Sequence, residues 1–97
     1  MHVLALAVDL HLPESRSLKS RRAVVKPLLD GIRRRYGVSA AEVGHQQTWQ
    51  RVAIGVAVVA GTAHHCTEVI DEVERFVWSH PEVQVLTMSR SWLELDD

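Results

Sequence analysis

The sequence predicts an α+β domain whose elements follow one another as strand, helix, strand, strand, helix, strand. Two observations support this prediction. Apolar residues recur at every second position in four stretches, the spacing of a half-buried strand, and at every third or fourth position in two others, the spacing of an amphipathic helix. The 97 residues suffice for one hydrophobic core, so we expect a single domain over residues 1–97.

The first strand is predicted over residues 2–12, which alternate in a period of two. Pro13 ends it, and either Ser15 or Ser17 can cap the next helix by accepting a hydrogen bond from a backbone N–H. The apolar residues of 18–36 then recur at helical spacing and predict the first helix.

Two residues bear on the shape of this helix. Pro27 removes the hydrogen bond to the carbonyl of Ala23, and its ring clashes there, so we expect a kink or a break into two pieces. Gly37 provides a C-terminal stop, because glycine readily adopts the left-handed conformation that ends many helices.

Residues 38–46 and 50–60 predict two further strands, joined as a hairpin by a short polar connection around Gln47 and Thr48. In the expected topology, strands 2–12 and 50–60 lie side by side in the centre of the sheet. Their helix-facing side carries large aliphatic residues that suit a core: Leu4, Leu6, Val8, Val52, Ile54 and Val56.

The second helix begins near Thr62 and ends at His80 and Pro81, and its apolar residues follow the i, i+3, i+4, i+7 pattern. Residues 82–91 predict the last strand. Strict alternation there places Val83, Val85 and Thr87 on one side, and Leu86 and Met88 on the other. The tail, residues 92–97, is predicted to be a short amphipathic end.

This order of elements is that of a ferredoxin-like fold, a four-stranded antiparallel sheet with two helices on one face. The open face of the two central strands is small and apolar, although a sheet facing water normally carries polar residues there. That face comprises Val3, Ala5, Ala7, Ala53, Gly55, Ala57 and Val59. We expect a homodimer that packs sheet against sheet, or a regulatory module that holds a partner or small ligand there. The alternative is a tolerated surface of small residues.

Charge is distributed unevenly, although the net charge is only -1. Residues 16–35 hold eight basic residues against the single acid Asp30, whereas residues 68–97 hold eight acids against two arginines. Such a basic segment suits contact with a phosphate backbone, and it also suits a solvated helix face or self-association. The candidate RNA-binding residues are Arg16, Lys19, Arg21, Arg22, Lys26, Arg33, Arg34 and Arg35. Because the open sheet face lacks aromatic residues on which bases stack, RNA contact is expected through the helix and loops.

Chemical motifs are sparse. The single cysteine, Cys66, forms no internal disulfide, and the N-terminal residues resemble neither a signal peptide nor a membrane span, so we expect a cytoplasmic protein without membrane contact. His64 and His65 stand beside Cys66, but adjacent helical positions point about 100° apart, which favours solvated helix-start residues over a metal site. Neither a framed catalytic group nor a phosphate loop is present, so we expect no enzyme activity, small-molecule substrate, metal or cofactor.

The stretch from Glu42 to Arg51, together with Gly55-Val56-Ala57-Val58-Val59 and Leu18-Lys19-Ser20-Arg21-Arg22, resembles the YlxP-like family, also called domain of unknown function 503. The resemblance implies a bacterial protein with a ferredoxin-like fold. Family genes commonly neighbour those of a ribosome-binding factor and a translation initiation factor. The resemblance therefore implies a link to ribosome maturation or RNA. Together with the basic first helix, it leads us to expect a non-enzymatic accessory protein of ribosome maturation or translation that binds the ribosome or structured RNA.

The residues that match the family's hairpin motif are His45, Trp49, Gln50 and Arg51. We expect Trp49 to anchor the hairpin by burying its ring, and His45 and Gln50 to satisfy polar groups near the turn. The alternative is that this corner of the molecule is a docking surface.

Overall fold

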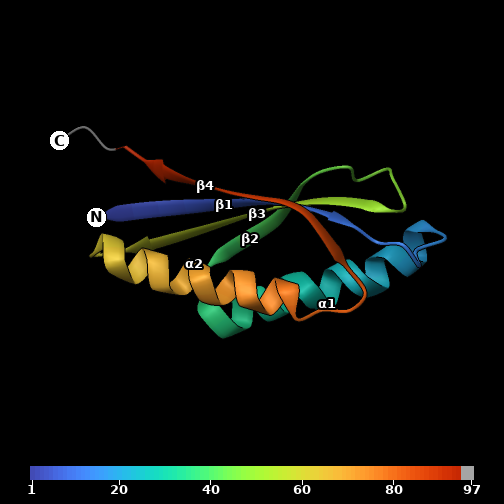
Figure 1. Ribbon diagram of the computed structural model, residues 1–97, viewed down its shortest axis with the longest axis horizontal. Helices are drawn as coiled ribbons and strands as arrows, with labels where there is room; N and C mark the ends of the chain where they lie inside the picture. Colours follow the sequence, from blue (N-terminus) through green and yellow to red (C-terminus); the bar gives the residue numbers. More distant parts are fainter. Residues whose placement is uncertain (95–97) are drawn as a thin grey trace.

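The computed structural model describes residues 1–94, which form one four-stranded antiparallel sheet and two helices (Figure 1). Along the chain these elements are β1 (His2–His11), α1 (Leu18–Tyr36), β2 (Ser39–Gly44), β3 (Arg51–Ala60), α2 (Ala63–Trp78) and β4 (Gln84–Leu93). The strand order across the sheet is β2-β3-β1-β4, so β1 and β3 lie in the centre as the sequence predicts. Both helices cover the same face (Figure 1).

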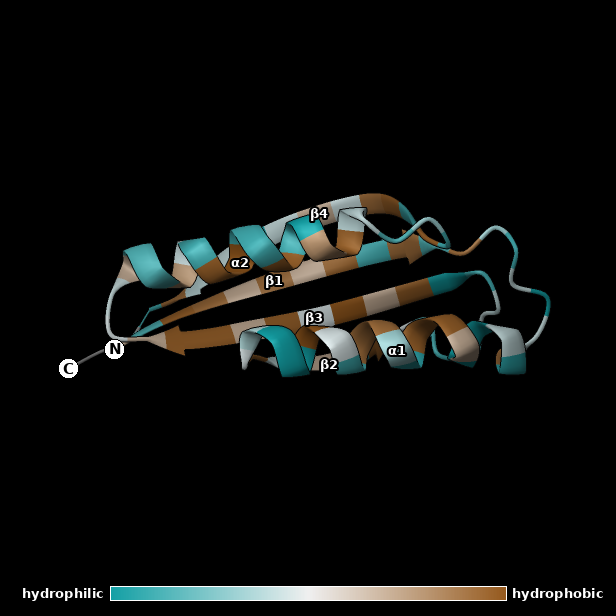
Figure 2. Cartoon of the chain, turned by 90° about the horizontal axis from the view of Figure 1, so that it is seen from below, coloured by the Kyte–Doolittle hydropathy of each residue, from teal (hydrophilic) through white to brown (hydrophobic). Residues whose placement is uncertain are grey.

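The core lies between the sheet and this helix layer. The six large aliphatic side chains predicted for the helix-facing side of β1 and β3 are all buried, which confirms that prediction. Figure 2 shows α1 and α2 turning apolar positions toward the strands and polar positions away from them. Within the described residues, neither helix is long and apolar enough to cross a membrane.

The start and end of α1 are both set by local hydrogen bonds. Ser17, rather than Ser15, is the N-cap: its hydroxyl accepts from the backbone N–H of Ser20, and the Ser20 hydroxyl accepts from the backbone N–H of Ser17. Gly37 has a φ of 62° and donates its N–H to the carbonyl of Arg33. The predicted glycine stop is therefore confirmed.

We expected a kink or a break at Pro27, and the break does not occur, because α1 runs as one helix from Leu18 to Tyr36. Pro27 and Ala23 both lie on the exposed side of the helix. The carbonyl of Ala23 loses its helical partner there, but water can hydrate it, so the lost bond is less costly than in a buried position.

The edge strands depart from the predicted alternation, because each pairs with its neighbour through an irregular register. Between β1 and β4 the register shifts at Asp9 and Leu10, so Val85 pairs with Leu10 and Met88 pairs with Val8. Val85 and Met88 therefore lie on the same side of the sheet, and their predicted separation is wrong. A bulge inserts one residue and reverses the alternation beyond it.

The predicted tail also needs correction. Trp92 and Leu93 belong to β4, where they pair with Leu4 and Val3. Glu94 follows the strand, and residues 95–97 of the predicted amphipathic end lie outside the described residues.

Candidate functional site

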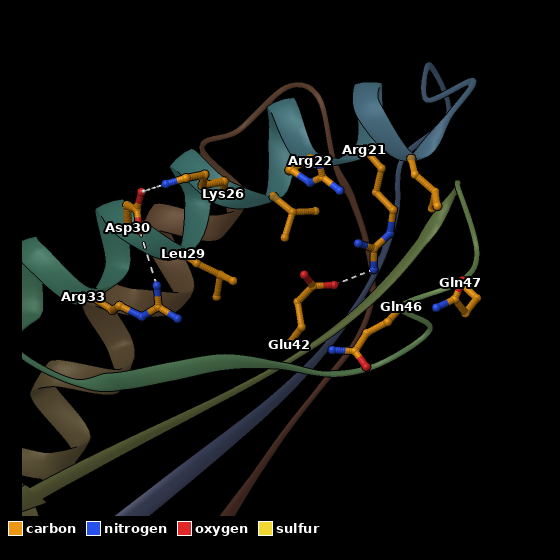
Figure 3. Close-up of a pocket in the computed structure, with 11 residues that line it drawn as sticks. Arg21, Arg22, Lys26, Leu29, Asp30, Arg33, Glu42, Gln46 and Gln47 are labelled. Atoms are coloured by element: carbon orange, nitrogen blue, oxygen red, sulfur yellow. Dashed lines mark hydrogen bonds and ion pairs between the residues drawn. The ribbon is translucent and has the colours of Figure 1, made fainter.

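A groove of about 480 Å³ runs between α1 and the hairpin of β2 and β3 (Figure 3). This volume lies within the usual range of ligand sites, about 300–1,000 Å³. Its apolar lining comes from α1 and comprises Leu18, Val25 and Leu29. Its polar lining comprises Arg21, Arg22, Lys26, Asp30, Arg33, Glu42, Gln46 and Gln47. The groove therefore combines an apolar floor with a predominantly basic rim.

Seven of the eight candidate RNA-binding residues are exposed, and Arg21 is buried. Three of them, Arg22, Lys26 and Arg33, line the groove from α1 (Figure 3). Within residues 1–94, Lys19 and Arg22 form no ion pair, and Lys26 lies 3.6 Å from Asp30 with a mostly exposed side chain. These cations remain accessible to an anionic ligand.

Arg21 plays a different part from the one predicted. Its guanidinium forms an ion pair of 2.6 Å with Glu42 and donates to the backbone carbonyls of His45 and Arg51 at 3.1 and 3.3 Å. Only 5% of the residue is exposed. The assignment of Arg21 to the phosphate-binding stripe is therefore corrected, because the residue is buried and its Nε and Nη2 groups bond to the hairpin.

The remaining arginines are exposed but partly engaged. Arg33 donates twice to the carbonyl of Ala40, at 2.9 and 2.6 Å, and so ties α1 to the start of β2. Arg34 donates to the carbonyl of Asp30, and the Arg35 guanidinium lies over the ring of Phe76. Arg16 donates to the carbonyl of Pro13 in the loop before α1.

Three residues of the hairpin motif fix the ends of the connection between β2 and β3. The Gln50 amide donates to the carbonyls of Pro13 and Ser15, which confirms its predicted role near the turn. Arg51 donates to both carboxylate oxygens of Asp9, at 3.3 and 2.8 Å. The Nε2 atom of His45 lies 3.6 Å from the same carboxylate, and His45 has a φ of 61°.

The hydrogen bond from Arg51 is the largest influence on Asp9, and it lowers the pKa of that carboxyl below its ordinary value. This ion pair was not predicted from the sequence. Both residues occupy odd positions on adjacent strands and therefore share the open face, as the pairing of His11 with Arg51 shows. Strand parity was the signal that could have revealed it.

Trp49 does not bury its ring, contrary to the prediction. It is 53% exposed, because β3 begins only at Arg51 and Trp49 lies beyond the end of the sheet. Gln50 makes the anchoring contacts that Trp49 was expected to provide. The docking alternative for this corner therefore remains open, with an aromatic ring available on its surface.

The open sheet face is uncovered by any other described part of the chain (Figure 1). Its centre holds a shallow hollow of about 330 Å³, lined by the predicted residues Ala5, Ala7, Gly55 and Ala57 and by edge-strand residues that include Val43. A Cβ atom on Gly55 would lie 3.0 Å from Val43 Cγ1, so glycine fits beside the bulged residue of β2. Val3, Ala53 and Val59 extend this face along the central strands.

At the start of α2, Cys66 points away from its two histidine neighbours. His64 and His65 have side chains that are 84% and 63% exposed, and both face Glu68 at 3.5 and 4.0 Å. Cys66 is fully buried instead. Their orientation matches the solvated helix start that the sequence favoured, with the thiol packed in the core.

Comparison with known proteins identifies the family. Residues 3–90 match the family model described as a protein of unknown function, DUF503. The chain belongs to the DUF503 family. The resemblance that the hairpin and α1 motifs indicated is thereby confirmed.

One protein is similar to this chain in sequence, and another is similar in structure. The chain is 34% identical over 76 residues to the uncharacterized protein YlxP of Bacillus subtilis strain 168, covering 78% of this chain and 83% of that protein. A de novo designed protein with a ferredoxin fold, solved by solution NMR, superimposes with a TM-score of 0.54 at 14% identity, over 98% of this chain and 88% of the designed one. At that identity the likeness concerns the fold alone, and it confirms the predicted ferredoxin-like fold.

Proposed function

We propose that this DUF503 protein is a non-enzymatic, cytoplasmic accessory protein that binds RNA or a ribosomal particle through α1 and the loop before it. The observation that supports the proposal is the exposure of seven basic side chains along this segment, three of them on the rim of one groove. Phosphate contacts by such side chains supply most of the sequence-independent affinity for nucleic acids. The link to ribosome maturation that the family resemblance implies agrees with this reading.

The electrostatics of the rest of the molecule support the same surface. Arg90 on β4 is held between Glu74 and Asp71 of α2 at 2.9 and 2.7 Å, and Glu74 chiefly raises the pKa of its guanidinium. Of the two arginines on that side, Arg90 is therefore neutralised by two acids, and Arg75 is exposed. An approaching polyanion meets accessible positive charge mainly along α1 and its loop.

The test compares two charge reversals of equal size, Arg22→Glu on α1 and Arg75→Glu on α2, both at exposed positions. Binding to ribosomal subunits and to a structured RNA is measured at salt concentrations between about 50 and 200 mM. Over roughly this range, affinity that depends on phosphate contacts falls steeply. We expect Arg22→Glu to lower the affinity about 10-fold and to reduce the slope of the salt dependence by about one phosphate contact. Arg75→Glu should change the affinity little. Equal losses of affinity in the α1 and α2 variants would contradict the proposal.

A second candidate function uses the open sheet face, where a second copy of the chain packs sheet against sheet. Small side chains at Ala5, Ala7 and Ala57 allow two sheets to approach closely. A four-stranded sheet with strands of this length offers a face on the order of 600 Å², somewhat below the roughly 800 Å² that each partner contributes to a standard interface. This second candidate is therefore a weak dimer.

Sedimentation at increasing concentration tests this second candidate. We expect the wild type to associate, and Ala57→Arg at the centre of the face to remain monomeric, because a charged side chain cannot be buried there without a partner. Glu72→Arg, at an exposed position of α2, is the matched control and should associate normally. A monomeric wild type at the highest concentration would exclude self-association through this face.

A further inference from the structure

Trp49 stands on a turn that is fixed at both ends although its own ring is free. On one side, the carbonyl of His45 accepts from the backbone N–H of Thr48 and from the Arg21 guanidinium. On the other, the carbonyl of Gln50 accepts from the N–H of Leu12, and the Gln50 amide is held by the loop before α1. The exposed indole is therefore presented on a rigid support.

The position of this ring relative to the charge matters more than its exposure, because single exposed aromatics are common. A separate shallow hollow on the hairpin turn is lined by Gln47, Thr48, Trp49 and Gln50. Gln47 also lines the basic groove, so the indole adjoins the end of the groove. Trp78 and Trp92 are also exposed, but they lie at the end of α2 and on β4, where the chain carries its acids. Of these three indoles, Trp49 is the one beside the accessible cations.

We infer that Trp49 is a stacking platform for one unpaired base of a single-stranded RNA segment, while Arg22 and Lys26 hold the phosphates beside it. This inference rests on the proposed function and adds the class of RNA that the site takes. An indole on a turn reaches a base only when the base is splayed out of a helix, so single-stranded or looped RNA fits and continuous duplex does not. Stacking accepts any base, so a site of this kind binds RNA without reading its sequence.

The experiment measures the affinity of the full chain for a 12-nucleotide oligouridylate and for a 12-base-pair RNA duplex, probe lengths of about one site of a single-strand-binding domain. We expect Trp49→Ala to weaken oligouridylate binding about 5- to 100-fold, the equivalent of one lost stacking contact. Trp49→Phe should retain most of the affinity, because a smaller aromatic ring still stacks. Trp78→Ala is the matched control and should bind like the wild type.

Duplex binding separates this inference from the proposed function. Arg22→Glu should weaken both probes, and Trp49→Ala should leave the duplex affinity unchanged. If Arg22→Glu weakens both probes while Trp49→Ala binds oligouridylate like the wild type, stacking is excluded and the proposed function stands. If the wild type binds neither probe at low salt, the proposed function itself fails. Equal binding of polyglutamate and oligouridylate, unaffected by Trp49→Ala, would show recognition of charge alone and overturn the inference.

A spectroscopic measurement checks the contact directly. In the variant Trp78→Phe with Trp92→Phe, all tryptophan fluorescence comes from Trp49. Addition of oligouridylate should quench this emission, because a stacked base lies against the indole, and the duplex should not. Unchanged emission at saturating oligouridylate would contradict stacking. Circular dichroism confirms that each variant is folded.

Discussion

Replacing Arg21 with alanine is expected to lower the free energy of unfolding by about 3 kcal/mol, the cost of breaking a largely buried ion pair. The change leaves Glu42 without its cation and removes one donor each from the carbonyls of His45 and Arg51. Glu42 is 24% exposed, so water recovers part of the loss. For a chain of this size, the expected decrease in Tm is roughly 10–20 °C, measurable by thermal denaturation.

Arg22→Ala is the matched control, because the same residue type stands one position along the same helix and is exposed. It should change stability by no more than about 0.5 kcal/mol. The two variants should therefore have different effects: the change at Arg21 lowers stability, and the change at Arg22 lowers RNA affinity. Equal melting temperatures for the two variants would show that the ion pair with Glu42 does not hold the hairpin to α1.

The fold was predictable because its central strands bury one face along their whole length. β1 and β3 have neighbours on both sides and pair through ten consecutive positions, so a period of two in the sequence is a period of two in space. The edge strands were less predictable for a physical reason. Bulges are more frequent at sheet edges, and at Val43 and Leu86 the composition of the sequence gives no sign of one.

The sequence predicted which residues make the surface of α1 basic, but not which of them bind other parts of the protein and which stay exposed. Clustered arginines predicted a basic surface, yet a helix turns each residue by about 100°. Arg21 therefore faces the hairpin while Arg22 faces solvent. The distinction depends on Glu42, twenty-one positions away, whose contact with Arg21 exists only after the hairpin has docked on α1. The prediction that Trp49 is buried was wrong for a similar reason. Whether the ring packs against the core depends on the residue at which β3 begins.

Gly31 has the second large expected effect, since replacing it with leucine should force α1 and α2 apart. Even a Cβ atom there would lie 2.7 Å from the tip of the Phe76 ring. The ring has little freedom to move away, because Tyr36 and His80 pack edge-on against it at 5.9 and 4.6 Å between ring centroids, and the Arg35 guanidinium covers it. We expect Gly31→Leu to lower the free energy of unfolding by about 2–3 kcal/mol, measured by urea denaturation.

Ala23→Leu adds an aliphatic side chain to an exposed position of the same helix and should leave stability nearly unchanged. If the contact with Phe76 is the cause, the cost of Gly31→Leu should be smaller when Phe76 is already alanine, because the vacated space accepts the new side chain. The two changes should then combine to less than their sum, by about 1–2 kcal/mol. Additive effects would mean that the ring moves aside freely, and that Gly31 sits in α1 for another reason than the close approach of α2.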